Sequence, residues 1–186
     1  MKGVIWKYLP KIDDPDLKDE MGRAGCRVLN PDPDFWEHEF PVWAICGPRV
    51  RVGLEIGDIL FFTPTRSRCE AAGVAGYLCT GLLTVGEIVP NGTALLRDPR
   101  FTDRYKRNYR VDLKMHLVDD ETTTARQRGR NIALGDPRKS AWFGRHGVPM
   151  SQALRRARIG DVRMSSRRVR DLTAKEAERL WRTLSE

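Results

Sequence analysis

The chain has 186 residues, with 33 Lys and Arg against 25 Asp and Glu, which gives a net charge of +8 and a pI near 9.6. Its mean hydropathy is −0.50, and no apolar run approaches the roughly 20 residues of a membrane-spanning helix. These values exclude a helical membrane protein. Since the start of the chain lacks a signal-peptide pattern, we expect a cytoplasmic protein with one domain, or one domain and an appendage.

The charge is unevenly distributed along the chain. Residues 11–40 hold nine acidic side chains against four basic ones, so this acidic segment carries −5 and the rest carries +13. A domain with such an excess of Lys and Arg favours a polyanionic partner, and nucleic acid is the most common one. The alternative is a basic surface that binds nothing in particular.

Cofactor and metal motifs are missing from the sequence. The four cysteines form no Cys-x-x-Cys pair, and the three histidines are scattered. This spacing favours neither a disulfide framework nor a zinc site. The sequence also has no Walker loop, no Gly-x-Gly-x-x-Gly after a strand and no Gly-x-Ser-x-Gly. We therefore predict no metal and no cofactor.

The first half of the chain predicts strands separated by loops. Residues 3–9 are typical of a strand, and most of the acidic segment is typical of loop. Residues 59–63 follow a tight turn at Gly57-Asp58 and form a second strand. Residues 77–89 are apolar but long and contain two glycines, which predicts one bent strand with a bulge or two separate strands.

The second half mixes helices and strands. Aromatic residues four apart predict a short helix over residues 101–109 that packs on the sheet. Residues 111–118 alternate apolar and polar side chains and predict a strand, and residues 131–134 predict a short one. A helix capped by Ser151 is expected over residues 151–158.

The C-terminal region combines many arginines with the clearest helix of the sequence. Residues 151–170 hold seven arginines against one acidic residue, a candidate contact surface for phosphates. Thr173 and Glu176 then have the spacing of a capping box, which predicts the start of a helix. Its apolar stripe consists of Ala177, Leu180, Trp181 and Leu184.

Hydroxyl and guanidinium groups gather just after the second predicted strand. The run from Thr63 to Arg68 holds three hydroxyls, two arginines and one proline. Such groups suit phosphate oxygens and base edges. An exposed polar loop is the alternative explanation for the same run.

Several short motifs follow one another along the chain: Cys46-x-Pro48-x-x-Arg51, then Gly57-Asp58 before a strand, then Thr63-x-Thr65-x-Ser67. Taken in this order, they resemble the PUA-like superfamily that includes EVE, ASCH and YTH domains. The order is similar to that of nucleotide-modification-associated domains found near DNA-modification and defence genes. Further similar points are the strand at 77–89, Asp98-Pro99-Arg100-Phe101, and Asn131-Ile132 before Gly135-Asp136.

This resemblance implies a fold and a domain arrangement. We expect an α+β protein with a mostly antiparallel, PUA-like β-barrel flanked by short helices and followed by a C-terminal helix. The barrel domain would span residues 1–149, with the acidic segment 11–40 as an insert. Residues 150–186 would form an Arg-rich segment and helix packed on the same domain.

The resemblance also implies a pocket at the barrel mouth that holds an unpaired, flipped or modified base. We therefore expect a nucleic-acid binding module, for DNA or RNA, that acts in a DNA-modification or defence context. The expected base pocket consists of Trp43, Thr63, Thr65, Ser67 and Trp142. The expected phosphate contacts are Arg51, Arg66, Arg68, Arg100, Arg104, Lys106, Arg155 and Arg156.

Two other functions remain open on the sequence alone. One is an enzyme that acts on a modified nucleobase or nucleotide, with Asp58, Glu87, Asp136 or His146 as acid–base groups. The chain lacks the Gly-x-Lys-x-x-Thr signature of ASCH-type amidohydrolases and nucleases, which disfavours that chemistry. The other is a regulatory protein-interaction domain that uses Trp36 and the acidic segment.

Overall fold

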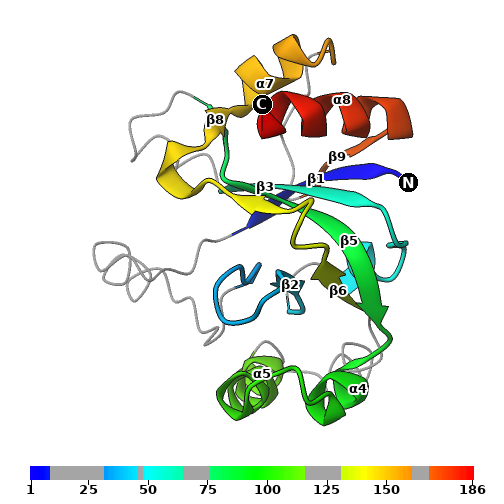
Figure 1. Cartoon of the computed structure of the whole chain (residues 1–186), viewed down its shortest axis with the longest axis vertical. Coiled ribbons are helices and arrows are strands. Elements are labelled where there is room, and N and C mark those ends of the chain that lie inside the picture. Colours follow the sequence, from blue (N-terminus) through cyan, green and yellow to red (C-terminus); the bar gives the residue numbers. More distant parts are fainter. Residues whose placement is uncertain (9–31, 46–47, 65–75, 116–130, 161–167) are drawn as a thin grey trace. The chain divides into compact units, whose positions relative to one another are not determined.

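The computed structural model describes residues 1–8, 32–45, 48–64, 76–115, 131–160 and 168–186 (Figure 1). The chain divides into two compact units, each assembled from separate stretches of sequence. Unit 1 comprises Met1–Leu9, Glu55–Gly86 and Asp136–Glu186, and unit 2 comprises Pro10–Leu54 and Glu87–Gly135. The secondary structure is mixed α and β, as predicted.

The sheet of unit 1 has the strand order β9, β1, β3, β5. Strand β1 (Gly3–Tyr8) lies parallel to β3 (Ile59–Pro64) and antiparallel to β9 (Arg168–Leu172). Strand β3 is antiparallel to β5 (Gly81–Val89), whose start also pairs with β7 (Ala141–Trp142). Most pairings are therefore antiparallel. The predicted closed barrel is not found in the described part of this unit, because β9 forms an open edge.

Residues 77–89 form two strands, which decides between the two predicted arrangements. Strand β4 (Leu78–Cys79) leaves the main sheet and pairs with β8 (Val148–Pro149). Thr80 separates it from β5, and the Thr80 amide donates a hydrogen bond to the Phe62 carbonyl. The break at Thr80 lets one stretch of sequence take part in two ladders.

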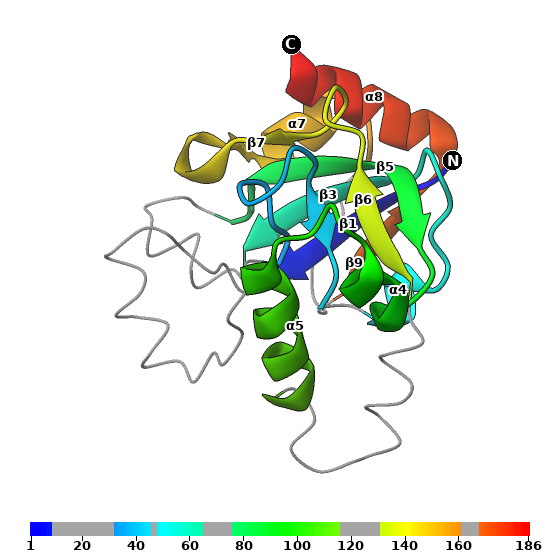
Figure 2. The ribbon, with the colours of Figure 1, turned by 60° about the horizontal axis from the view of Figure 1, so that its bottom comes forward.

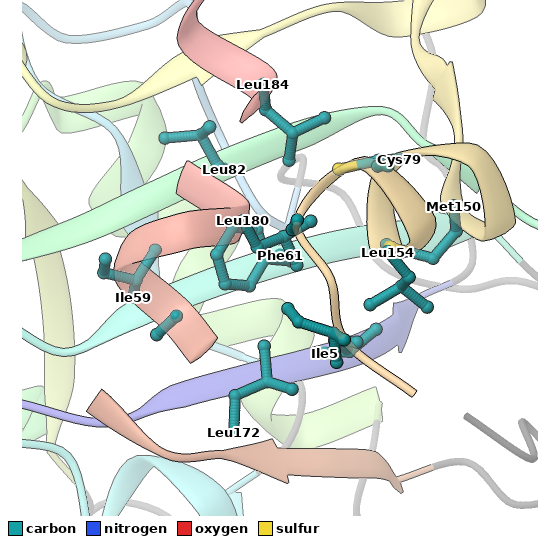
Figure 3. Close-up of a cluster of buried hydrophobic side chains, with 14 residues drawn as sticks. Ile5, Ile59, Phe61, Cys79, Leu82, Met150, Leu154, Leu172, Leu180 and Leu184 are labelled. Carbon is teal, nitrogen blue, oxygen red and sulfur yellow. The ribbon is translucent and has the colours of Figure 1, made fainter. Parts of the chain in front are cut away.

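Two helices cover one face of this sheet, α7 (Met150–Arg156) and α8 (Ala174–Ser185) (Figures 1 and 2). Figure 3 shows the apolar side chains that meet between sheet and helices. The sheet contributes Ile5, Ile59, Phe61, Leu82 and Leu172, and the helices contribute Met150, Leu154, Leu180 and Leu184. The C-terminal segment thus shares its core with the N-terminal strand.

The sequence signals at the helix starts have different outcomes. The capping box of α8 is confirmed, since the Thr173 side chain accepts from the Glu176 amide and the Glu176 carboxylate accepts from the Thr173 amide. The predicted Ser151 cap is wrong. Helix α7 begins one residue earlier, after Pro149, and has no side-chain cap. A fixed proline φ just before the first turn is compatible with that start.

The described part of unit 2 contains a short antiparallel pair of strands and three helices. The strands are β2 (Val42–Trp43) and β6 (Ile132–Gly135). The helices are α2 (Pro48–Arg51), α4 (Gly92–Arg97) and α5 (Asp103–Met115). Their core consists of Val42, Ala44, Ile45, Val89, Leu95, Phe101, Tyr105, Tyr109, Ile132 and Leu134.

The predicted aromatic stripe is confirmed and fixes the position of α5. Phe101, Tyr105 and Tyr109 are all buried in the unit 2 core. The predicted strand at 111–118 is wrong as far as it is described, because α5 continues to Met115. The alternation in that stretch involves few β-branched residues, so the helix that the tyrosines anchor extends through it.

Candidate nucleic-acid interface

The net charge of the protein lies in unit 1. This unit contains 17 Lys and Arg against 9 Asp and Glu, whereas unit 2 contains 16 of each. Unit 1 therefore carries +8 and unit 2 carries zero. The charge that would attract a polyanion is thus concentrated in the unit that holds α7 and α8.

The outer face of α8 carries a basic stripe. At about 100° per residue, Ala177, Leu180 and Leu184 lie on one side of the helix, and all three are buried. Lys175, Arg179 and Arg182 fall on the opposite side, where they line an open hollow together with Glu178. Burial of the apolar stripe turns the opposite side of α8 toward solvent. The apolar stripe therefore determines the direction in which the basic stripe points.

Helix α7 adds three arginines at its C-terminal end. Arg155 and Arg156 occupy its last turn and Arg158 follows, and all three are exposed. Helices α7 and α8 pack against each other over the same face of the sheet (Figures 1 and 2). We refer to the following residues together as the basic surface: Arg155, Arg156, Arg158, Lys175, Arg179 and Arg182.

Most cations of the basic surface have no ion pair with the described part of the chain. Arg182 is the exception, since its guanidinium lies 2.5 Å from a Glu178 carboxylate oxygen. No such partner among the described residues approaches Arg155, Arg156, Arg158, Lys175 or Arg179. A cation without a carboxylate neighbour can exchange solvent counterions for phosphate oxygens at little cost.

Only part of this surface was predicted from the sequence. Arg155 and Arg156 were predicted as phosphate contacts, but the basic stripe on α8 was not. The signal was present in the sequence, because Lys175, Arg179 and Arg182 follow the same helical period as the apolar stripe, half a turn away. Projection of the predicted helix onto its wheel would have revealed it.

Arg100, another predicted phosphate contact, lies in a dense ion cluster in unit 2. Its guanidinium donates to both Glu87 carboxylate oxygens at 2.7 Å and to Asp98 at 2.6 Å. These bonds lower the pKa of Glu87 and Asp98 and raise that of Arg100. Two carboxylates around one guanidinium leave this cluster negative, so it does not attract phosphate.

We expect the Arg100 cluster to stabilise unit 2 in a pH-dependent way. Since Glu87 and Asp98 have lowered pKa values in the folded state, their stabilisation is present at neutral pH and is lost as the pH falls below the ordinary values of 4.5 and 3.8. Arg100→Gln should lower the free energy of unfolding by about 1 kcal/mol at pH 7, since solvent screens these half-exposed groups. Urea titrations across the acid range should show this difference shrink; a constant difference would contradict the cluster.

The remaining predicted phosphate contacts vary in their surroundings. Arg104 pairs with Glu37 at 2.9 Å, and Lys106 lies near Asp98. Helix α5 also exposes Arg107 and Arg110, which share their side of the helix with Asp103. Arg66 and Arg68 lie outside the described residues. The basic residues of unit 2 are thus interspersed with acidic ones.

Arg51 is buried and serves the backbone of unit 2. Only 1% of the residue is exposed, and its guanidinium donates to the carbonyls of Asn131 and Ile45. It therefore joins α2 to the residue just before β6 and to the chain that follows β2. These hydrogen bonds explain why an arginine occurs at this position without any need for a phosphate contact.

We expect Arg51→Met to destabilise the protein without a specific effect on binding. The substitution leaves buried carbonyl oxygens without their donors, which should lower the free energy of unfolding by about 2 kcal/mol or more. Chemical denaturation would measure the loss. Unchanged stability, together with weaker nucleic-acid binding by the folded variant, would instead assign Arg51 to the interface.

The residues predicted to form a base pocket have separate surroundings. Trp43 is fully buried in unit 2, and Thr63 is fully buried in unit 1, where its hydroxyl donates to the Pro64 carbonyl. Trp142 is half-buried, and its indole lies against Gly81, where a Cβ would be 2.6 Å away. Thr65 and Ser67 lie outside the described residues. Neither Trp43 nor Thr63 has an exposed face that a base could reach.

Three of the four candidate acid–base groups, Asp58, Glu87 and Asp136, have structural contacts. Asp58 is buried and accepts from the Lys2 and Glu55 amides, and Asp136 accepts from the Arg138 amide. Glu87 belongs to the Arg100 cluster, and His146 is exposed. Burial raises the pKa of the Cys79 thiol to about 12, so it is no nucleophile at neutral pH.

One buried polar pair was not expected from the sequence. The His38 side chain is 2% exposed, and its Nδ1 lies 3.5 Å from an Asp34 carboxylate oxygen. Its ring stacks on Phe40 and meets Phe101 and Tyr105 edge-on. Asp34 also accepts from the Trp36 and Glu37 amides, so the pair orders the chain that enters β2. The i, i+4 spacing of Asp34 and His38 is visible in the sequence, but the burial of their side chains is not.

The described structure thus defines an α+β protein with an open, mostly antiparallel sheet and a basic surface on two helices. Comparison with family models, with curated proteins and with solved structures yields no match. Among the described residues, no helix is long and apolar enough to cross a bilayer, and no three metal-ligating side chains gather at one point.

Proposed function

We propose that the protein binds nucleic acid through the basic surface of unit 1. The observation that carries this proposal is the set of five exposed cations, on or beside α7 and α8, that pair with no carboxylate of the described residues. They lie in the unit that holds the whole net charge of +8. Salt-bridged arginines such as Arg100 offer no comparable attraction, because their partner carboxylates repel phosphate.

The physical basis of such binding is counterion release. Each cation that neutralises a phosphate frees a condensed counterion, so affinity falls steeply as salt is raised. Five contacts give a slope of about −4.5 in a plot of log K against log salt. This mode of binding needs no base pocket, and it is compatible with the burial of Trp43 and Thr63. A more specific form of the proposal is that the protein recognises a modified base in a DNA-modification or defence context.

The proposal is tested by fluorescence anisotropy of a labelled 20-base-pair duplex with the purified full chain. Between 50 and 200 mM NaCl we expect the affinity to fall by about 10³-fold. An affinity that hardly changes over this range would contradict phosphate contact as the source of binding. The absence of any binding at 50 mM would contradict the function itself.

A further inference from the structure

We propose, on the basis of the proposed function, that the basic surface selects double-stranded over single-stranded nucleic acid. The inference rests on which side chains accompany the cations. Proteins that prefer single strands offer aromatic rings for base stacking. The described part of the basic surface provides none.

No aromatic ring is available for stacking on α7 or α8. The large exposed apolar side chains of the described residues are Met1, Trp36, Val52, Ile56 and Val111, none of which belongs to these helices. Helix α8 does contain Trp181, but this ring packs against the unit 1 core, and its Nε1 donates to the Lys139 carbonyl at 3.0 Å. Bases of a single strand would therefore find no platform here.

When binding depends on charge alone, the ligand with the higher charge density binds more tightly. A duplex carries one negative charge per ~1.7 Å of its axis, against ~3.4 Å for one of its strands. From Lys175 to Arg182 the stripe extends over about 10 Å at 1.5 Å per residue. The cations of the stripe limit the number of contacts, but each contact releases about 0.9 counterions from a duplex against about 0.7 from a single strand. The basic surface therefore gains more from a duplex.

An anionic membrane is disfavoured by the same geometry. A helix that binds a bilayer surface inserts an apolar face below its cationic one. The apolar face of α8 is already buried against the sheet, where Ala177, Leu180 and Leu184 belong to the core. Figure 3 shows Leu180 and Leu184 in this position. Acidic lipids would meet the charges only, without an apolar anchor.

The test compares five probes with the same full-length protein at 100 mM NaCl. They are two 20-base-pair duplexes of unrelated sequence, one strand from each, and vesicles that contain phosphatidylserine. We expect each single strand to bind at least about tenfold more weakly than its duplex. Arg179→Gln should weaken both duplexes, whereas the matched control Arg104→Gln, in the Glu37 pair, should not.

The outcomes separate the inference from the function on which it rests. Single strands that bind as tightly as duplexes would overturn the inference but leave nucleic-acid binding intact. Binding to none of the nucleic acids would overturn the proposed function. Tight binding to vesicles with weak binding to duplexes would overturn both and assign the surface to a membrane.

Discussion

Simultaneous replacement of Arg155, Lys175 and Arg179 by glutamine is expected to lower the affinity for duplex DNA about 100-fold at 150 mM salt. The estimate follows from counterion release, in which three lost phosphate contacts reduce the slope of log K against log salt by nearly 3. All three side chains are exposed, so the variant should fold normally. Anisotropy titrations at constant salt measure the loss directly.

The matched control removes three charges from unit 2 instead. Arg97, Arg104 and Arg107 are also exposed and lie on α4 and α5, and the triple glutamine variant has the same net charge as the first. We expect the control to weaken binding only a few-fold, through the overall field. If the two variants lose affinity equally, net charge rather than the basic surface determines binding, and the proposed location is wrong.

Gly147→Ala is expected to have the largest effect on stability. A Cβ at this position would lie 2.0 Å from the Cys79 carbonyl oxygen, which belongs to the backbone of the neighbouring strand β4. Neither atom can move without separating β4 from β8. The cost of such a clash should exceed about 3 kcal/mol of unfolding free energy.

The control for this substitution is Gly160→Ala. Nothing lies within 4 Å of a Cβ at Gly160, which is exposed, so its stability should change by no more than about 0.5 kcal/mol. Thermal and urea unfolding of the two variants measure the difference. A Gly147→Ala variant as stable as the control would show that β4 and β8 do not approach each other as closely as described.

The β4–β8 contact also matters for the basic surface. The first amide of α7, at Met150, donates to the Tyr77 carbonyl at 2.7 Å, directly before β4. Displacement of β8 would therefore shift the start of α7, which carries Arg155 and Arg156 near its end. Stability and binding are linked at this point through the backbone rather than through the charged side chains.

Elements with local signals could be predicted from the sequence. The capping box of α8 and its apolar stripe identify the helix completely, and the turn at Gly57-Asp58 precedes β3 as expected. Gly57 has φ of +89°, a conformation that glycine adopts freely, and Asp58 accepts from the Glu55 amide to close the turn. In each case neighbouring residues determine the structure.

Elements that depend on distant partners could not be predicted. Strand β9 lies in an Arg-rich stretch without apolar alternation, and it forms a strand because β1 offers a free edge. The parallel pairing of β1 with β3 joins residues more than fifty positions apart. The resemblance to PUA-like domains implied a barrel, whereas the described strands of unit 1 form an open sheet.

The candidate site shows the same division. The sequence reveals where arginines are, but the ligands of each guanidinium depend on the fold. Arg51 is enclosed by carbonyls, Arg100 by carboxylates, and Arg155 by solvent, although all three were equal candidates for phosphate contact. Trp43 likewise has an aromatic ring of the kind that stacks on bases, but this ring is buried in the core.

The most direct test of the basic surface is the NMR titration of the 15N-labelled protein with a 20-base-pair duplex. The largest amide shifts are expected at residues 155–158 and 175–182, with little change along α5, whose exposed Arg107 and Arg110 are the main competing cations. Shifts that concentrate on α5 while α8 remains unchanged would contradict the account.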